Sequence, residues 1–143
     1  MAGKGEQLRD LMTADPIVLD ASATVAEAAK CMRDRDVGDV LVRRNGRLAG
    51  ILTDRDLVVR CLASEENDPR RQPVGELCSQ DLLTLPPDAD VEEAMQLMQE
   101  NAVRRIPIVE GDRAVGIVSL GDLAIARDRR SCLGEISAAP PNS

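Results

Sequence analysis

The sequence predicts an α/β (α+β) fold that consists of two tandem copies of one strand–helix–strand–strand–helix unit. The main observation is an internal repeat: a shift of 66 residues aligns residues 11–57 with 77–123, and 14 of the 47 pairs are identical. Unrelated segments match at only a few positions, so this match indicates a duplication. Two copies are too few for an open solenoid, whose units need several neighbours. We therefore expect a closed pair of units packed about a pseudo-twofold axis.

In the first copy the predicted elements are a strand, a helix, two strands and a helix, at residues 17–19, 22–36, 40–42, 48–52 and from about 54 onward. The first helix is predicted by small and apolar residues that recur on one helical face, namely Val25, Ala28, Ala29 and Met32. The pair Asn45-Gly46 between the last two strands is typical of a tight hairpin turn.

The second copy repeats this order with one difference. Its first helix carries Val91, Ala94, Met95 and Met98 on one face, its hairpin strands fall at 106–109 and 114–118, and its last helix begins near 120. Pro107 lies inside the first hairpin strand. Because proline has no backbone N–H, we expect that strand at the edge of its sheet.

These elements divide the chain into four parts. We expect a first domain at 1–63 with an N-terminal helical segment, a polar linker at 64–73, a second domain at 74–130 and a C-terminal tail at 131–143, of which residues 138–143 are predicted to be disordered. Short helical turns at about 6–12 and 75–78 precede the two copies, and we expect them to pack across the copies.

The composition excludes several classes of function. The 18 Lys and Arg residues against 25 Asp and Glu give a net charge of −7, and the chain has no Phe, Tyr or Trp. Nucleic-acid-binding proteins use clustered cations and stacking rings, and this chain lacks both. No apolar run is long enough to cross a membrane, and no signal segment opens the chain. We expect a cytoplasmic protein that binds neither nucleic acid nor a membrane.

The chain also has no His, which removes the commonest general base and most zinc and haem sites. No nucleophile has a base partner and no P-loop is present, so we expect no catalytic residue, no metal site and no required cofactor. The cysteines, Cys31, Cys61, Cys78 and Cys132, show no CxxC spacing. We interpret them as reduced, mostly buried thiols, with a redox or metal role as the alternative.

One polar pattern occurs at the same place in both copies. A strand ends at a hydroxyl residue, Thr53 or Ser119, and an aspartate, Asp56 or Asp122, follows three residues later at the start of a helix. The structural interpretation is a capping box. The functional interpretation uses the same groups: the aspartate accepts ribose hydroxyls, the helix N-terminus and the hydroxyl bind phosphate, and the glycine three residues before the hydroxyl admits a flat ring. The pattern fits a ribonucleotide site, and both interpretations remain open.

The segments GILTDRD at 50–56 and GIVSLGD at 116–122, the opening LMTADPIV and the strand RRIPIV resemble the cystathionine β-synthase (CBS) domain. The tandem pair resembles a Bateman module, most of all the small free-standing CBS-pair proteins of bacteria. The resemblance covers about residues 11–123. It implies two β-α-β-β-α domains that bind an adenosine compound (AMP, ADP, ATP or S-adenosylmethionine) as a regulatory ligand in the cleft between them. It also implies a homodimer.

The resemblance assigns three roles to residues of this chain. The ribose hydroxyls of two sites are held by Asp56 and Asp122, with Thr53 and Ser119 on ribose or phosphate. The adenine edge is read by backbone groups around Val18, Val40, Thr84, Ile106 and Pro107, and the purine lies between aliphatic side chains. Phosphate is neutralised by Arg55 and Arg105, for which Arg104 is a competitor and solvated surface charge is the alternative interpretation.

The two copies differ where phosphate is expected. The first copy has Asp39 where the second has Arg105. We therefore expect tighter binding at the second site, and occupancy of one site alone fits this difference. Some relatives carry a metal between a His and a Cys, and that role does not transfer to a chain without His.

Two functions follow from these observations. The first is a non-catalytic regulatory module, in which a bound nucleotide stabilises one domain orientation and an effector protein in trans reads it. The alternative is a structural or protein-interaction CBS-pair protein with vestigial nucleotide sites. Apolar helical residues at 61–62 and 123–125 agree with a homodimer in either case.

Overall fold

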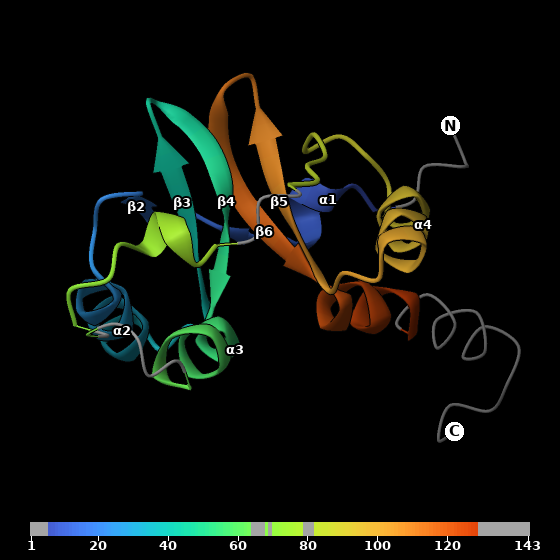
Figure 1. Cartoon of the computed structure of the whole chain (residues 1–143). Helices are drawn as coiled ribbons and strands as arrows, with labels where there is room; N and C mark the ends of the chain where they lie inside the picture. The colour runs from blue at the N-terminus through green and yellow to red at the C-terminus, as the bar shows by residue number, and fades with distance from the viewer. Residues whose placement is uncertain (1–5, 64–67, 69, 79–81, 129–143) are drawn as a thin grey trace, which may run out of the picture. The chain divides into compact units, whose positions relative to one another are not determined.

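The computed structural model describes residues 6–63, 68, 70–78 and 82–128, which form two compact units (Figure 1). The first-repeat unit comprises the described residues of the ranges 15–83 and 111–114, and the second-repeat unit those of 1–14, 84–110 and 115–143. Each unit combines a three-stranded sheet with helices, which confirms the mixed α/β fold of two similar units. The expected tail at 131–143, part of the linker at 64–73 and Cys132 lie outside the described residues.

The first-repeat unit follows the predicted order of elements. In chain order these are β2 (Val18–Asp20), α2 (Val25–Arg35), β3 (Asp39–Arg44), β4 (Arg47–Thr53), α3 (Asp54–Asp56), the π-helix η1 (Leu57–Leu62) and the 3₁₀-helix η2 (Val74–Glu76). The sheet order is β2-β3-β4, with β2 parallel and β4 antiparallel to β3. The backbone φ angles of Asn45 and Gly46 are 54° and 78°, as a two-residue hairpin turn requires.

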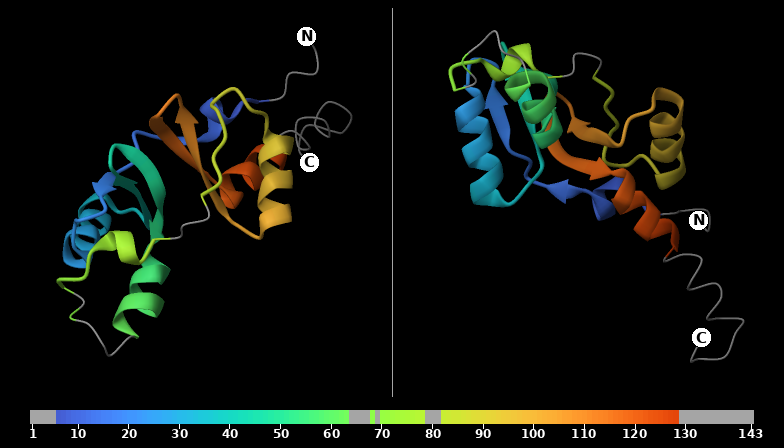
Figure 2. Two further views of the ribbon diagram at one scale, coloured as in Figure 1. Left: turned by 45° about the horizontal axis from the view of Figure 1, so that its top comes forward. Right: turned by 60° about the horizontal axis from the view of Figure 1, so that its bottom comes forward.

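The core of this unit lies between its sheet and its helices, and Figure 2 shows α2 alongside the sheet. The buried face of α2 packs against side chains that alternate along the strands; the main members of this core are Val25, Ala28, Met32, Val40, Val42 and Leu52. Ala29 was expected on the same helical face, but it is exposed at the border of the apolar stripe. Thr24 begins the helix, because its hydroxyl accepts a hydrogen bond from Glu27 N at 3.2 Å.

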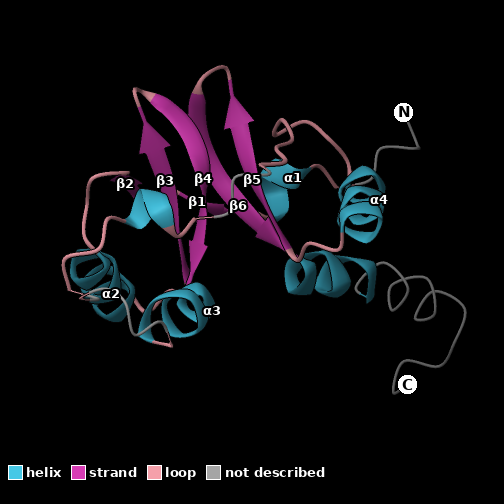
Figure 3. Cartoon of the chain, viewed as in Figure 1, coloured by secondary structure: helices cyan, strands magenta, loops and turns pink. Residues whose placement is uncertain are grey.

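The second-repeat unit is built in a similar way (Figure 3). Its elements are α1 (Leu8–Leu11), β1 (Thr13–Ala14), α4 (Val91–Asn101), β5 (Arg105–Glu110), β6 (Arg113–Ser119) and helical residues 120–128. The sheet order is β1-β6-β5, with β1 antiparallel to β6. Its core is formed by buried residues of α4, both hairpin strands and the last helix, including Val91, Ala94, Met98, Ile106, Val118 and Leu123.

Pro107 and Pro87 account for one difference between the two sheets, and Pro87 lacks the N–H that the equivalent Ala21 donates to Arg43 O at 2.7 Å in the first-repeat unit. In the first-repeat unit Leu41 N donates to Ile17 O at 2.8 Å, next to the parallel pair β2–β3. Pro107 occupies the equivalent position in β5 and has no N–H to donate. There the preceding segment makes one isolated parallel bridge, between Leu85 and Ile108, where the repeat predicted a strand. As expected, β5 is an edge strand of its three-stranded sheet.

The short helix before the first repeat packs on the core of the second. Leu8 of α1 is fully buried among residues of the second-repeat unit. The N–H groups of Leu8 and Arg9 donate to the carbonyls of Ala89 and Pro87, both at 2.9 Å. The expected range 1–63 groups this segment with the first repeat by chain order, whereas its contacts group it with the second.

The short helix before the second repeat makes the equivalent contacts in the first-repeat unit. Val74 of η2 is fully buried in that core. Val74 N and Gly75 N donate to Ala23 O and Ala21 O at 2.8 and 3.0 Å. These bonds are equivalent to those of α1, with donors 66 residues later and acceptors 66 residues earlier in the chain. The two lead-in helices therefore pack across the repeats.

We predict that Leu8→Ala lowers the free energy of unfolding by about 2–4 kcal/mol, because it removes a fully buried side chain and leaves a cavity. Urea denaturation followed by circular dichroism measures this loss, and hydrogen exchange should increase in β5 and β6 before β3 and β4. The control is Arg9→Ala, on the exposed side of the same helix. Faster exchange confined to the first-repeat unit would contradict the assignment of α1.

Candidate functional site

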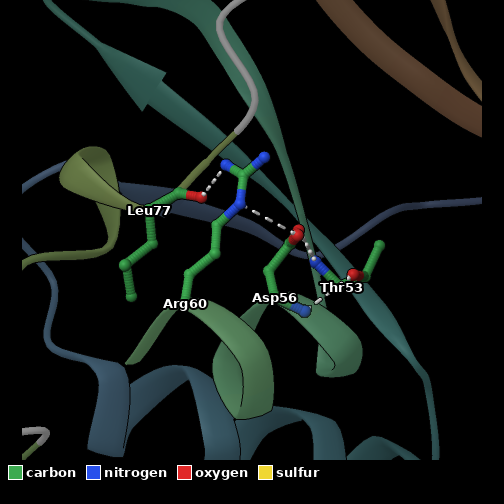
Figure 4. A network of polar contacts seen from close by, with 4 residues as sticks. All are labelled: Thr53, Asp56, Arg60 and Leu77. Atoms are coloured by element: carbon green, nitrogen blue, oxygen red, sulfur yellow. Dashed lines mark hydrogen bonds and ion pairs between the residues drawn. The ribbon is translucent and has the colours of Figure 1, made fainter. Parts of the chain in front are cut away.

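The two predicted nucleotide motifs lie where a hairpin strand passes into a helix. We call Thr53 and Asp56, between β4 and α3, the first junction, and Ser119 and Asp122, between β6 and helix 120–128, the second junction. In the first junction Thr53 Oγ1 accepts from Asp56 N at 3.1 Å, and Asp56 Oδ2 accepts from Thr53 N at 2.9 Å (Figure 4). In the second, the same bonds of Ser119 Oγ and Asp122 Oδ2 measure 3.1 and 2.9 Å. Both junctions are therefore capping boxes.

A capping box and a ribose site are compatible at these positions. The reciprocal bonds use one carboxylate oxygen, Oδ2, of each aspartate. The other carboxylate oxygen, Oδ1, takes no part in the capping box. The hydroxyl oxygen of Thr53 or Ser119 only accepts in the capping box, so its own hydrogen remains available for donation to a ligand. All four side chains are half-buried, so the groups are held in place and still reach solvent. The structure confirms the capping boxes, and the ribose site stays a prediction that the same residues can accommodate.

The backbone amides of the junctions are partly used by the chain itself. Asp54 N donates to Gly38 O at 3.0 Å, and Leu120 N donates to Arg104 O at 2.8 Å. The capping boxes occupy the amides of Asp56 and Asp122 as well. The expected use of helix N-terminal amides for phosphate is correspondingly reduced, and the carboxylate and hydroxyl are the main groups available to a ligand.

The glycine of the second motif serves the fold of its own unit. A Cβ added to Gly116 would clash with the Met12 side chain and lie 3.0 Å from Thr13 O. Gly116 of β6 pairs with Ala14 of β1. The absence of a side chain at Gly116 therefore leaves room for β1 and for Met12, the residue before β1. Met12 thus occupies the space on the Cβ side of Gly116, and the expectation that the motif glycine admits a flat ring stays a prediction.

The residues expected around adenine contribute in different ways. The side chains of Val40 and Ile106 are buried in the two cores, and that of Pro107 is fully buried outside the core cluster, so all three offer a ligand only their backbone. Val18 is half-buried at the start of β2, and Thr84 is exposed and outside regular structure. Of the candidates for phosphate, Arg55 is exposed on α3, Arg104 is exposed before β5, and Arg105 is half-buried as the first residue of β5.

The sequence analysis missed Arg60, which contacts the first junction. Arg60 Nε lies 3.7 Å from Asp56 Oδ1, and Arg60 Nη1 donates to Leu77 O at 3.0 Å (Figure 4). The spacing of four residues between Asp56 and Arg60 on a helix is the signal that could have indicated the pair. In the second junction the equivalent position is Ala126, and no described Lys or Arg forms an ion pair with Asp122.

A surface cavity of about 630 Å³ lies in the second-repeat unit beside α4 and helix 120–128. Its lining includes Met95, Met98, Arg104, Leu120 and Arg127. Neither Ser119 nor Asp122 lines this cavity, but Leu120, which lies between them in the chain, does, so the cavity adjoins the second junction.

The described cysteines agree with the interpretation as reduced thiols. Cys61 and Cys78 are 1% and 4% exposed, and Cys31 is half-buried. Burial raises the pKa of the Cys61 and Cys78 thiols above the ordinary value, because the low-dielectric core disfavours a thiolate. Among the described residues, no cluster of three or more His, Cys, Asp or Glu side chains is arranged to hold a metal ion.

The duplicated fold and its paired strand–helix junctions match a known family. The CBS domain matches residues 8–62 and 74–129, and the chain belongs to this family as a tandem CBS pair. One relative, the CBS domain-containing protein YhcV of Bacillus subtilis, is 39% identical over 118 residues, which cover 82% of this chain and 83% of YhcV. Hypoxic response protein 1 of Mycobacterium tuberculosis is 36% identical over 117 residues and 81% of each chain.

Solved structures show the same fold. The crystal structure of Hypoxic Response Protein I, which has two coordinated zinc ions, superposes with a TM-score of 0.73 at 35% identity and covers 83% of this chain and 97% of its own. The CBS domain pair of protein MJ0100, in complex with 5′-methylthioadenosine and S-adenosyl-L-methionine, gives a TM-score of 0.76 at 22% identity, over 89% and 99% of the two chains. No described helix of this protein is long and apolar enough to span a membrane.

We predict that iodoacetamide alkylates Cys61 and Cys78 at least about tenfold more slowly than Cys31 in the folded protein, because burial restricts access and disfavours the reactive thiolate. Mass spectrometry of tryptic peptides at increasing reaction times measures the three rates. In about 6 M guanidinium chloride, where the core is exposed, the three rates should converge. Equal rates in the folded protein would contradict the burial of these thiols.

Proposed function

We propose that this protein is a non-catalytic regulatory module that binds an adenosine compound through the ribose hydroxyls. The observation that carries the proposal is the repeated junction: a half-buried hydroxyl and carboxylate are held by the same reciprocal bonds in both repeats. A carboxylate at a strand–helix boundary suits a ribose, because two neighbouring hydroxyls can donate to it. The MJ0100 complex supports this choice of ligand class as a property of a protein with the same fold.

The proposal assigns no catalytic step. The junction aspartates are already engaged with backbone amides, and the chain has no His to act as a base. Binding then acts by stabilising one conformation of the protein over another, and AMP, ADP, ATP and S-adenosylmethionine are the candidate ligands. An effector protein in trans would respond to that conformation.

The second junction is the proposed tighter site for ligands that carry phosphate. Arg105 begins β5, whereas Asp39 begins β3 at the equivalent position in the first repeat. Asp39 pairs with Thr53 across β3 and β4, so its negative charge lies beside the first junction. A carboxylate there disfavours a phosphate by like-charge repulsion, and a guanidinium favours it.

A structural or interaction role with vestigial nucleotide sites is the second candidate. It is favoured by exposed apolar side chains on η1, where Val58, Val59 and Leu62 are 56%, 51% and 63% exposed. Ile125 on the last helix is 57% exposed. Such groups on helices suit a protein–protein contact, and we propose a homodimer in the cytoplasm. The two candidates differ in one measurable property, which is stabilisation by an adenosine ligand.

The freshly purified protein provides the first test. Without Trp or Tyr the chain is nearly transparent between about 260 and 280 nm. A band near 260 nm that is released by denaturation and identified by mass spectrometry would reveal a co-purified nucleotide. If no band is present, thermal melts with added AMP, ATP, adenosine and S-adenosylmethionine decide between the two candidates. Absence of stabilisation by all four would favour the interaction role.

We predict that Asp122→Ala abolishes the ligand-induced stabilisation from the second junction, which reaches about 2.7 kcal/mol at a ligand concentration of 100 Kd. Loss of the cap by itself costs about 0.5–2 kcal/mol with or without ligand. Thermal melts with and without AMP separate the two effects. Asp88→Ala, in an exposed turn before α4, is the matched control with the same change in charge. An unchanged ligand-induced shift in Asp122→Ala would exclude the ribose role.

We predict that Arg105→Ala weakens binding of ATP and ADP by about ten- to a hundredfold and binding of adenosine much less, because a charge-assisted bond to phosphate is worth about 1.5–3 kcal/mol. Isothermal titration calorimetry with the three ligands measures the difference. Arg104→Ala tests the competing candidate, and Arg9→Ala, exposed on α1 of the same unit, is the control with the same change in charge. Equal losses for ATP and adenosine would remove the phosphate role of Arg105.

A further inference from the structure

The two junctions share their capping boxes and differ in one cation. Arg60 follows Asp56 by four residues and forms an ion pair with the carboxylate oxygen that the capping box leaves outside, Asp56 Oδ1 (Figure 4). This oxygen is also one to which a ribose hydroxyl would donate. At the second junction the equivalent residue is Ala126, which is fully buried and carries no charge.

The π-helical turn of η1 accounts for the placement of Arg60. Ala63 N donates to Val58 O, five residues earlier, at 3.0 Å. The wide turn puts Leu57 and Cys61, four residues apart, into the core. In helix 120–128 the buried residues are Leu123 and Ala126, three residues apart. The position that is buried as Ala126 in the second repeat is therefore on the surface as Arg60 in the first.

A second contact holds Arg60 in this position. Its Nη1 donates to the carbonyl oxygen of Leu77 at 3.0 Å, while its Nε faces Asp56 Oδ1 at 3.7 Å. The side chains of Arg60 and Asp56 are 52% and 22% exposed. An exposed ion pair is normally weak, partly because two long side chains lose freedom when they pair. The bond to Leu77 already restricts Arg60, so less freedom is lost when it pairs with Asp56.

We propose that Arg60 is a specificity-determining residue that competes with ribose for Asp56 and so makes the first junction the weaker adenosine site. The inference rests on the proposed function, because it takes the junction aspartates as ribose acceptors. A ribose hydroxyl at the first junction competes with the guanidinium of Arg60 for Oδ1, whereas the second junction has no such competitor among the described residues. The difference holds for an uncharged ligand, to which the phosphate-dependent effects of Arg105 and Asp39 do not apply.

Adenosine is the probe, since it has the ribose and no phosphate. The Asp122→Ala background leaves the first junction as the ribose site, and Arg60→Met removes the cation there while it keeps an unbranched side chain. We expect Arg60→Met in this background to tighten adenosine binding by about two- to fivefold, the effect of releasing one exposed ion pair. Isothermal titration calorimetry measures the change, and circular dichroism checks the fold of each variant.

Two controls separate competition from other effects. Arg33→Met in the same background removes an exposed arginine on α2, with the same change in net charge, and should leave the affinity unchanged. Asp56→Ala in the same background should abolish the remaining binding. Arg60→Lys in the same background keeps the charge, but lysine lacks the forked guanidinium that reaches Asp56 and Leu77 together. Its adenosine affinity should therefore lie between that of Asp122→Ala and that of the double variant with Arg60→Met.

Salt provides a readout that needs no substitution at Arg60. Raising NaCl from about 0.05 M to about 0.5 M screens the ion pair, so adenosine binding to Asp122→Ala should tighten with salt. In the Arg60→Met double variant the affinity should not depend on salt.

Equal or weaker adenosine binding after Arg60→Met, with binding that still depends on Asp56, overturns the role of Arg60 and leaves the proposed function standing. Adenosine binding to Asp122→Ala that does not depend on salt also overturns the role of Arg60. This outcome can be measured even if Arg60→Met fails to fold. If neither the wild-type protein nor any variant binds adenosine, the proposed function and this inference both fail.

Discussion

The reciprocal hydrogen bonds between a hydroxyl residue and an aspartate three residues later are the constraint on which both units depend. At the end of β4 and of β6 the chain leaves a sheet and begins a helix, and amides at that boundary lose their strand partners. Thr53 with Asp56, and Ser119 with Asp122, satisfy two of these amides in each repeat. The same bonds fix the direction of the following helix and hold a carboxylate at its start. The candidate site is thus a by-product of how the strand ends.

Because the backbone of the junction is determined by these bonds, the residues around it were able to diverge after duplication. Arg60 and Ala126 stand at one equivalent position, and Asp39 and Arg105 at another. In each pair only one repeat carries a positive charge: Arg60 lies on η1 and contacts the first junction, and Arg105 is the first residue of β5. Similar folds therefore present different electrostatic surroundings to a ligand, and unequal sites are the expected result.

The units are not built from contiguous sequence. The lead-in helix of each repeat fills the core of the other, with Leu8 buried in the second-repeat unit and Val74 in the first. Burial of one such side chain contributes about 1.5–3 kcal/mol, a large part of the stability of a small domain. The stability of each unit therefore depends on residues that precede the other repeat.

The sequence by itself determined the duplication, the order of the elements, the hairpin turn at Asn45-Gly46, the edge position of β5 and the pairing of each hydroxyl with its aspartate. These features depend on local spacing, on backbone preferences and on the missing N–H of Pro107, all of which are readable along the chain. Only the tertiary structure decided which repeat each lead-in helix joins, that Met12 fills the space beside Gly116, and that Arg60 reaches Asp56 and Leu77. Those contacts join residues far apart in the sequence or depend on a π-helical turn, and hydrophobic periodicity specifies neither of them.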